Sequence, residues 1–418
     1  MSGQPFTKSA RRWFTWAVAA LVLAAGTGLA AEDWPQFLGP ERNGIYRGPP
    51  LSENWPAGGP RVVWRKPVGQ GFAAPVIVQG RLLVFHRLGT NEVLDALDAR
   101  TGAAQWRYQY PTRYRDDFGF DEGPRSAPVV INGMVYTYGA EGQLHAVDLT
   151  TGQRVWSVDA MNQFKVPKGF FGAAGSPLVE EGRVLVNVGG PKAGIVAFDA
   201  KTGAVLWTTT DDQASYSSGV AATLGGRRHA IFLTRNGLLG LDPATGAVLF
   251  QRAWRARYAA SVNVAAPLVV GDLLFISAEY GPGAGVMRVD GGKLVDLWTS
   301  DEALSNHYAT SVVHNGVLYG YHGRQEYGPS LRAVDLTTGK VRWSEEQFRA
   351  GSITLAGDRL LIVRERGEML LAPASPDAFR PTVRAQIFTG TVRTYPALAD
   401  GFVYLRNDDT LVCLDLRK

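Results

Sequence analysis

The sequence predicts an all-β fold in which one four-stranded unit is repeated along the chain. The first observation behind this prediction is a recurring segment with the pattern A-x-D-x-x-T-G-x-x-x-W. Full copies occur at residues 96–106, 146–156, 197–207 and 333–343. In each copy the Asp can accept hydrogen bonds from turn amides and the Gly can adopt a positive φ. The segment therefore has the chemistry of a hairpin with a short loop.

The second observation is the spacing of the aromatic residue that closes each unit. From Trp64 onward these residues follow one another at intervals of 42 to 51 residues, which is the length of a four-stranded blade. Such a unit cannot bury its own faces and has to stack on copies of itself. The count predicts an eight-bladed β-propeller of antiparallel blades. The units at 217–250 and 353–387 are irregular, so seven blades remain an alternative.

A third observation is that most units open with a short apolar run, as at 74–78 and 127–131. A turn such as Asn132-Gly133 then leads into a second apolar run at 135–138. Short apolar runs of this kind indicate strands that are buried on both faces of a sheet. The sequence therefore predicts that these strands form the core of each blade.

Residues 1–30 are predicted to be a secretory signal peptide. They contain three basic residues and no acid, then an apolar run at 13–25 and a small-residue cleavage site at 28–30. So short a run favours a cleaved signal, with an uncleaved anchor as the alternative. Arg11-Arg12 matches a twin-arginine signal only in part, and the export route stays open. We therefore expect a periplasmic or otherwise exported protein, without stable membrane insertion once the signal is removed.

The charge and the cysteine count restrict the kinds of partner and of site that we expect. The chain carries 43 Lys+Arg and 38 Asp+Glu, and three of these bases lie in the signal. The remaining near-balance gives no support to nucleic acid as a partner. The single Cys413 excludes an intrachain disulfide, and its place in an apolar strand indicates a buried side chain. No pattern of metal ligands occurs, and no metal site is predicted.

Residues 31–59 form an irregular lead-in rich in Pro and Gly, and the propeller is predicted to occupy residues 60–418. The last unit, from Tyr395 onward, supplies only three strands. The segment 61–67 has the character of a final blade strand placed first in the chain. We therefore expect residues 62–64 to complete the last blade, which joins the ends of the ring and removes an exposed sheet edge.

The repeats resemble the tryptophan-docking repeats of the pyrroloquinoline quinone (PQQ) propeller superfamily over residues 60–418. The resemblance implies a structural role in which each tryptophan lies against Ala and Gly of the neighbouring blade. The residues with this predicted docking role are Trp64, Trp106, Trp156, Trp207, Trp298 and Trp343. The superfamily includes quinoprotein alcohol dehydrogenases, and similar repeats occur in non-enzymatic outer-membrane assembly lipoproteins. The segment 33–44 also resembles the opening of exported bacterial PQQ-repeat proteins without an assigned reaction.

Three departures from the dehydrogenases count against that activity. Those enzymes carry a disulfide between adjacent cysteines over the cofactor, which a single cysteine cannot form. They are also considerably longer, with large insertions around the site. No motif here matches their Ca²⁺-binding Glu and Asn or their catalytic Asp. The sequence itself requires no cofactor, the resemblance allows PQQ with Ca²⁺, and the catalytic residues stay unknown.

The links from one blade to the next are the most informative segments for function. Several are long and rich in charged and aromatic residues, as at 113–125 and 164–171. In a propeller they share one face, around the central channel, with the loops between the second and third strands. His86 and His322 each follow a hairpin glycine by six residues, so they are expected at equivalent places in two blades. The predicted ligand-binding face comprises Arg125, Lys168, His307, Tyr308, Arg324, Glu326 and Arg393.

We expect Arg125, Lys168, His307 and Arg324 to converge at the mouth of the channel and to bind an anionic group, with His307 responding to pH. Neither arginine belongs to the repeat core. Replacing Arg125 or Arg324 by Ala is therefore expected to weaken binding without lowering thermal stability. The alternative is a set of solvated loops that are held by local ion pairs.

Two functions follow from these observations. The first is a binding or scaffold protein for a small molecule or an exported protein partner, which needs only the predicted face. The second is a PQQ-dependent oxidoreductase acting on alcohols or sugars, which also needs a divalent cation and a carboxylate base. The candidate bases are Asp116, Asp117, Asp121 and Glu122.

Overall fold

The computed structural model describes residues 1–3, 33–256, 258 and 263–418. It divides the chain into two units, 1–30 and 31–418, and the second contains the described strands. The predicted signal peptide lies, apart from its first three residues, outside the described residues. In the described part of the chain, no helix combines the length and the apolar character that a membrane crossing needs.

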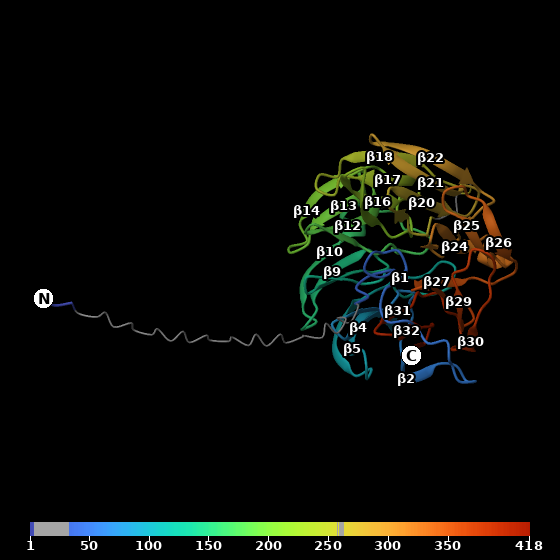
Figure 1. Cartoon of the computed structure of the whole chain (residues 1–418). Coiled ribbons are helices and arrows are strands. Elements are labelled where there is room, and N and C mark those ends of the chain that lie inside the picture. The colour runs from blue at the N-terminus through green and yellow to red at the C-terminus, as the bar shows by residue number, and fades with distance from the viewer. Residues whose placement is uncertain (4–32, 257, 259–262) are drawn as a thin grey trace. The chain divides into compact units, whose positions relative to one another are not determined.

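Eight four-stranded antiparallel sheets follow one another around a ring (Figure 1). Blade 1 consists of β3 (Val76–Val78), β4 (Arg81–Leu88), β5 (Asn91–Asp98) and β6 (Ala104–Pro111). Blade 2 consists of β7 (Val129–Ile131), β8 (Met134–Tyr138), β9 (Gln143–Asp148) and β10 (Arg154–Asp159). Blade 3 consists of β11 (Leu178–Glu180), β12 (Arg183–Gly190), β13 (Ala193–Asp199) and β14 (Val205–Thr209). Blade 4 consists of β15 (Val220–Leu224), β16 (Arg227–Leu233), β17 (Gly237–Leu241) and β18 (Val248–Ala253).

The second half of the ring repeats this order. Blade 5 consists of β19 (Leu268–Val270), β20 (Leu273–Ala278), β21 (Gly283–Asp290) and β22 (Lys293–Ser300). Blade 6 consists of β23 (Val312–His314), β24 (Val317–His322), β25 (Ser330–Asp335) and β26 (Val341–Glu345). Blade 7 consists of β27 (Gly351–Ala356), β28 (Arg359–Arg364), β29 (Glu368–Pro373) and β30 (Val383–Gln386). Blade 8 consists of β31 (Ala397–Ala399), β32 (Phe402–Arg406), β33 (Thr410–Asp415) and β2 (Arg61–Pro67).

The predicted eight-bladed propeller is confirmed, and the alternative of seven blades is wrong. Both irregular units form complete sheets, as blades 4 and 7. The predicted closure is also confirmed, because β2 pairs antiparallel with β33 and Trp64 stands opposite Cys413. Cys413 is buried, as its place in an apolar strand indicated.

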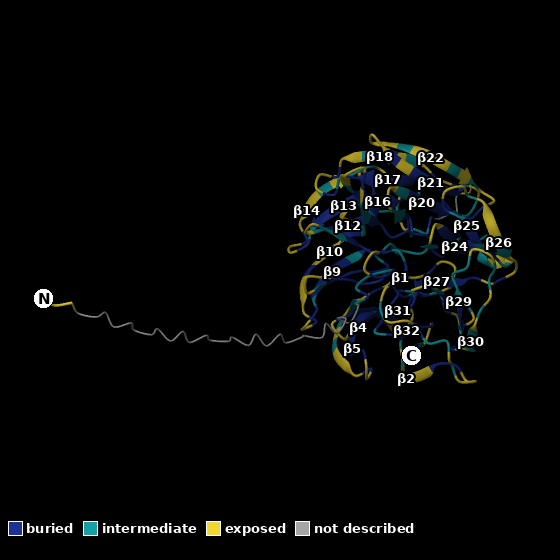
Figure 2. Ribbon diagram, in the orientation of Figure 1, coloured by how far each residue is buried: buried dark blue, intermediate teal, exposed yellow. Residues whose placement is uncertain are grey.

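Burial falls from the inner strands of each blade to the outer strand (Figure 2). In blade 1, the six central residues of β5 are all buried, whereas β6 alternates between exposed and half-buried positions. A strand inside a blade is covered on both faces by neighbouring blades, and the outer strand reaches solvent. The repeat turn holds the two strands together: Asp148 Oδ1 accepts from the Thr151 backbone N–H at 2.8 Å, and Gly152 has a φ of 72°.

The repeat tryptophans lie at the junctions between blades. The indole Nε1 of Trp64, the last tryptophan before blade 1, donates to Ala99 O at 3.0 Å, and its ring covers Gly102 so closely that a Cβ there would lie 2.9 Å from it. The same donation to the next blade, at 2.8 to 3.0 Å, is made by Trp106, Trp156, Trp298 and Trp343. Trp207 covers Gly246 of the next blade, but its Nε1 has no hydrogen-bond partner among the described residues.

The lead-in crosses the ring and fills the centre of the channel. Leu38 belongs to one buried cluster with four residues that precede the first strands of blades 1, 2, 5 and 8, namely Ala74, Ala127, Ala266 and Tyr395. Blades 1 and 5 stand opposite each other in an eight-membered ring, so a cluster that joins both sides lies near the axis. The segment thus closes the channel from within, a role that its irregular sequence did not indicate.

Three further contacts fix this plug, which we define as residues 34–52. Arg42 is almost wholly buried and donates through Nη1 to Gly219 O of the link before blade 4 at 2.8 Å. β1 (Ile45–Tyr46) adds to blade 7 as a fifth strand, parallel to β27. The hydroxyl of Tyr46 accepts from the Gly401 backbone N–H of blade 8 at 2.7 Å. The plug is therefore bonded to blades on several sides of the ring.

Candidate functional site

A cavity of about 390 Å³ lies where the links between blades meet. Its lining comes from the links that precede the first strands of seven blades, all except blade 7, and from two loops between second and third strands. Phe37 of the plug also lines it, next to Leu38 in the channel. This cavity, called the channel cavity below, is therefore the mouth of the central channel on one face of the propeller.

Half of the residues that line the channel cavity are aromatic. They are Phe37, Phe72, Phe118, Phe120, Phe171, Tyr216, Tyr280, Tyr308 and Tyr395. The charged residues in the lining are Arg125, Arg393 and Glu326, with His307 beside them. A largely apolar wall with a few placed polar groups is the usual composition of a small-molecule site.

Hydroxyl groups hold neighbouring links in place around the channel cavity. Ser176 Oγ accepts from the Ala127 backbone N–H at 2.9 Å, and Ser218 Oγ accepts from the Ser176 N–H at 3.0 Å. On the other side, the Tyr395 hydroxyl accepts from the Thr310 N–H at 2.5 Å. The first two bonds join consecutive links and the third joins the links before blades 6 and 8, so the positions of the lining residues are set by the closed ring as a whole.

Arg125 lies in the wall of the channel cavity with only 11% of its side chain exposed. Its Nη2 donates to the fully buried Asp116 at 3.1 Å, and its guanidinium lies 5.6 to 5.8 Å from the ring centroids of Phe72, Tyr114 and Phe171. Its buried Nη1 has no hydrogen-bond partner among the described residues. The geometry argues against the expectation that Arg125→Ala leaves stability unchanged, since the substitution would leave the Asp116 carboxylate buried without its cationic partner.

His307 forms a connected polar group with neighbours from two loops. The Gln325 backbone N–H donates to His307 Nδ1 at 3.3 Å, and His307 Nε2 lies 2.9 Å from the Tyr280 hydroxyl. The guanidinium of Arg324 lies 4.9 Å from the centroid of the Tyr280 ring and donates to Glu326 at 3.3 Å. Arg324 itself does not line the channel cavity, but it covers Tyr280, which does.

Burial lowers the pKa of His307 to about 4, because the surrounding wall desolvates the imidazolium. The ring is therefore neutral throughout the range near neutrality. The lowered pKa argues against the expectation that His307 gives a pH response near neutrality at the mouth of the channel. The structure keeps it as a fixed hydrogen-bonding group.

Acidification is expected to destabilise the fold through buried neutral histidines. The folded pKa of His307 lies below the unfolded value of about 6.5, so its contribution to stability is present above 6.5 and is lost as the pH falls toward 4. Burial lowers the pKa of His145 and His322 in the same way. Thermal melts at pH 7 and pH 5 should show a drop in Tm that is smaller in His307→Gln. An equal drop in that variant would contradict the role of His307.

The two other residues of the predicted face that line the channel cavity are Arg393 and Tyr308. Arg393 Nε donates to Glu365 at 2.7 Å, and its guanidinium lies 5.1 Å from the centroid of Phe120. The hydroxyl oxygen of Tyr308 is buried without a hydrogen-bond partner in the described structure. Burial raises the pKa of Tyr308 well above its usual range, so the hydroxyl keeps its proton.

Lys168 is the one member of the predicted face that lies apart from this group. It forms an ion pair with Asp117, and both side chains are more than half exposed. It lines a separate pocket together with Arg113 and Arg115. Five of the seven predicted residues thus line the channel cavity, Arg324 lies directly behind its wall, and Lys168 does not reach it. Whether they bind a ligand stays a prediction.

The carboxylates that the sequence offered as catalytic bases do not line the channel cavity. Asp116 accepts from the backbone N–H groups of Phe118, Phe120 and Asp121 as well as from Arg125. Asp121 accepts in turn from two glycine amides at 2.7 and 3.0 Å. These bonds fix the conformation of the link at 113–125. Because its acidic side chains are used in these bonds, the link can lie beside an aromatic wall.

The plug and the first link supply two lining residues that sequence reasoning missed, Phe37 and Phe72. Neither stands in a repeat motif, and their positions in the channel depend on the path of the plug. His86 and His322, in contrast, occupy equivalent places as expected. Each accepts through Nδ1 from the backbone N–H of a link residue, Gly69 at 2.8 Å and Ser305 at 3.0 Å.

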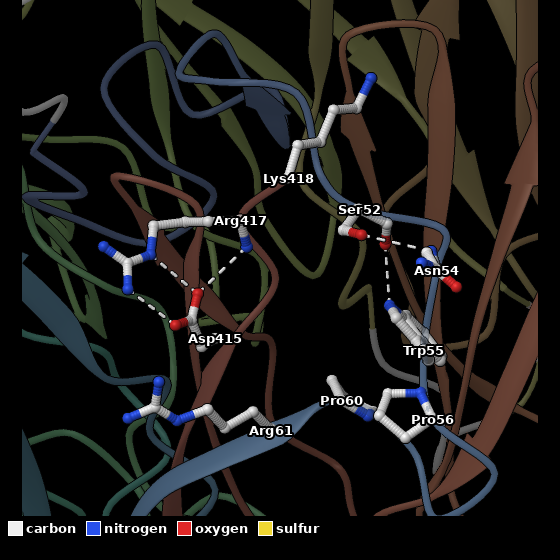
Figure 3. Close-up of a pocket in the computed structure, with 9 residues that line it drawn as sticks. All are labelled: Ser52, Asn54, Trp55, Pro56, Pro60, Arg61, Asp415, Arg417 and Lys418. Atoms are coloured by element: carbon white, nitrogen blue, oxygen red, sulfur yellow. Dashed lines mark hydrogen bonds and ion pairs between the residues drawn. The ribbon is translucent and has the colours of Figure 1, made fainter.

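A second pocket of about 380 Å³ lies between the end of the plug and the C-terminal segment (Figure 3). Arg417 is engaged with Asp415 through two bonds of 2.7 and 2.8 Å, and the Trp55 indole donates to Ser52 O at 2.8 Å. Lys418 points away from the other lining residues. Several polar groups of this pocket are thus bonded to one another, which fits a seam between chain segments.

Comparison with known proteins finds similarity to two groups, the BamB assembly factors and the quinohemoprotein alcohol dehydrogenases. The model of the PQQ_2 family, which is described as outer membrane protein assembly factor BamB, matches residues 90–345 and 253–418. A quinohemoprotein alcohol dehydrogenase of Pseudomonas putida is 34% identical over 140 residues, or 32% of this chain and 19% of that protein. The assembly factor BamB of Yersinia pestis is 24% identical over 244 residues, or 56% of this chain and 60% of that protein. The matched part of the chain therefore spans about a fifth of the dehydrogenase and 60% of the assembly factor.

Solved structures agree on the architecture. BamB of Moraxella catarrhalis superposes with a TM-score of 0.61 at 16% identity, covering 85% of this chain and 97% of that one. The quinohemoprotein alcohol dehydrogenase of Comamonas testosteroni gives a TM-score of 0.66 at 16% identity, covering 93% and 81%. At such identity these likenesses show the propeller fold alone.

Proposed function

The chain belongs to the PQQ_2 family, described as outer membrane protein assembly factor BamB, and on that premise we propose that it is an exported binding propeller. Its channel cavity holds a small organic molecule with an aromatic part. The observation that carries this proposal is the cavity itself, in which the plug, the links before seven blades and a loop of blade 5 bring together nine Phe and Tyr side chains. A volume of about 390 Å³ lies in the range of small-molecule sites.

The polar groups of the wall support a ligand-binding role. The guanidinium groups of Arg125 and Arg393 and the imidazole of His307 stand among the aromatic rings of the lining. A few placed polar groups in a largely apolar wall give a small-molecule site its specificity.

A protein partner is the second candidate, favoured by the family and by the rim of the channel cavity. Phe118 and Phe120 are each 53% exposed, and Phe118 also contacts Phe170 with ring centroids 6.1 Å apart. Exposed aromatic groups are common anchors at protein interfaces. An assembly role would use this rim as a docking surface, with or without a molecule in the cavity.

The cavity meets only some of the requirements of a quinoprotein, which binds PQQ together with a calcium ion. Its rings and guanidinium groups fit PQQ, which is flat, aromatic and carries carboxylates. The calcium ion that accompanies PQQ in the dehydrogenases needs six to eight oxygen ligands. Glu326 is the single carboxylate in the lining, and the described residues contain no group of three or more His, Cys, Asp or Glu side by side. The donor set therefore does not fit the cation, and no catalytic step is derived through it.

The proposed function predicts that a neutral aromatic probe binds in the channel cavity and that filling the cavity prevents this. N-phenyl-1-naphthylamine, whose fluorescence rises in apolar sites, should bind with a saturable signal. Ala174→Trp places an indole in the cavity and should weaken binding at least tenfold. Ala104→Trp, at an exposed position of β6, is the matched control.

Three measurements decide this proposal. Thermal melts show that both tryptophan variants are folded. Equal probe binding by the two variants, or no saturable binding to the unaltered protein, would refute a small-molecule site. Native mass spectrometry of protein purified from its own host would then show whether a molecule of a few hundred daltons accompanies the chain.

A further inference from the structure

We infer that a second site, outside the channel cavity, binds a phosphate monoester. It is a pocket of about 360 Å³ at blade 7, lined by the link before that blade, the loop between β28 and β29, and the end of β30. Among the described residues, blade 7 is the one blade whose link does not line the channel cavity. The blade 7 pocket, as it is called below, is therefore separate from the proposed channel site and does not depend on its ligand.

The lining of the blade 7 pocket carries an excess of positive charge. Its charged residues are Arg349, Arg364, Arg366 and Glu368. Three guanidinium groups thus stand against one carboxylate, which leaves an excess of two positive charges. Arg349 and Arg366 are both exposed, and neither guanidinium has an ion pair or a hydrogen bond among the described residues. Both groups are therefore open to a ligand.

The third arginine of the pocket is a fixed positive charge. Arg364 Nη1 donates to Glu368 at 2.7 Å, and the Arg364 guanidinium lies 4.0 Å from the ring centroid of Phe348. Phe348 is buried and packs against Phe379, with ring centroids 5.1 Å apart and an interplanar angle of 88°. Since Arg364 is already bonded to Glu368, the ligand is assigned to the two open arginines alone.

The backbone that carries the open arginines is held in place. The Glu365 N–H of the loop donates to Ala350 O of the link at 2.8 Å, and Arg366 O accepts from Gln386 Nε2 at 2.6 Å. In the link, Arg349 itself has a φ of 68°. Such a value is rare for a residue with a long side chain, and residues of this kind concentrate at functional sites. The link and the loop thus keep two like charges at one pocket without an acidic partner between them.

A phosphate monoester fits the blade 7 pocket better than other anions. At pH 7 it carries about two negative charges, which match the excess in the lining. Its oxygens accept forked bonds from more than one guanidinium at once. A carboxylate or a phosphodiester carries a single charge and would leave one arginine unmatched. Phe348 is the one apolar residue in the lining and is buried, so an aromatic or long apolar ligand finds little surface here.

The corresponding pocket of blade 2 provides an internal comparison. It has a volume of about 420 Å³ and also lies between the link and the loop of one blade, where Arg113, Arg115 and Lys168 line it. Arg115 is paired with Glu122, however, and Lys168 with Asp117. Two of its three cations are thus neutralised, so a similar set of residue types does not give two open charges.

The test is isothermal titration calorimetry of the full mature chain at pH 7 and constant ionic strength. Methyl phosphate is expected to bind at least tenfold more tightly than dimethyl phosphate or acetate. Arg349→Gln and Arg366→Gln should each weaken its binding at least fivefold and leave the Tm unchanged, because neither guanidinium has a partner. Arg113→Gln, in the blade 2 pocket, is the matched control and should bind methyl phosphate as the unaltered chain does.

Three results would overturn the inference: no saturable binding of methyl phosphate, equal affinities for the monoester and the diester, or an equal loss in Arg113→Gln. Binding of N-phenyl-1-naphthylamine in the channel cavity should be the same in all these variants. A failure of the phosphate site therefore leaves the proposed function standing, and a failure of the channel site leaves the phosphate site standing.

A lipid head group and a soluble ester are the two sources of such a phosphate. Phosphatidylcholine vesicles with phosphatidic acid as the sole charged lipid present the monoester on a membrane. Flotation of the chain with these vesicles, abolished by methyl phosphate and by Arg366→Gln, would assign the lipid source. Calorimetric binding of methyl phosphate without flotation would assign the soluble one. Either result supports the monoester site, whereas flotation that Arg366→Gln does not weaken would contradict it.

Discussion

A chain that lacks residues 31–66 is expected to lose its cooperative unfolding transition and to associate into larger species. The deletion removes β2, the seven-residue strand that completes blade 8. Strand β33 would then present an open edge, which is a template for pairing with other chains. It also removes Trp64 and Lys66, which donate to Ala99 O and Gly102 O of blade 1 at 3.0 and 3.1 Å. The ring would thus open at the junction of blades 8 and 1.

A shorter deletion separates the strand from the plug. Removal of residues 31–59 keeps β2 and the closure of the ring but takes away Leu38 and Arg42 from the channel. This variant is expected to remain a monomer with a cooperative but lowered transition. Circular dichroism melts and sedimentation velocity on both proteins provide the measurement. A monomer with an unchanged Tm after the longer deletion would contradict the closure as a source of stability.

The repeats could be predicted from the sequence because their determinants are local. The Asp and Gly of each turn and the tryptophan that closes each unit lie within eleven residues, as in 146–156. Turn chemistry and strand alternation act over that distance. The closure by residues 62–64 was predictable as well, since a unit with three strands leaves an edge that a strand elsewhere must cover.

The plug could not be predicted because its contacts are non-local. Arg42 bonds to a carbonyl 177 residues away, and no residue next to it in the chain indicates this. Polar residues in an irregular segment usually lie in solvent, whereas Arg42 is almost wholly buried. Burial lowers its pKa to about 9 through desolvation, although the carbonyl groups around it stabilise the charged form.

The position of the site could be predicted from the sequence, but its burial and its aromatic lining could not. Links between blades meet at one face by geometry, which is why Arg125 and Arg393 come together there. The charged residues suggested an open, solvated mouth. The structure instead has an aromatic cavity in which Arg125 is buried and His307 is held neutral. Burial depends on how all eight blades pack, and the residue types alone do not determine it.

Replacement of Trp156 by Ala is expected to lower the free energy of unfolding by about 3–5 kcal/mol. Trp156 is only 8% exposed, lies between blades 2 and 3, and donates through Nε1 to Ala200 O at 3.0 Å. Its ring covers Gly203, where a Cβ would lie 2.8 Å from the indole. The substitution therefore leaves a cavity at a junction that repeats around the ring, and Ala200 O keeps only the hydrogen bond from the Tyr136 hydroxyl.

Two further variants, Trp156→Phe and Trp207→Ala, separate the contribution of apolar packing from that of the indole hydrogen bond. Trp156→Phe keeps much of the apolar contact and loses the bond to Ala200 O, so about 1–2 kcal/mol is expected. Trp207 is half-buried and its Nε1 has no partner among the described residues, so Trp207→Ala should cost less than Trp156→Ala. Equilibrium urea melts give each value. Because each blade contacts only its two neighbours, a loss at one junction is not compensated elsewhere in the ring. A cost below about 1 kcal/mol for Trp156→Ala would show that the tryptophan does not fasten one blade to the next.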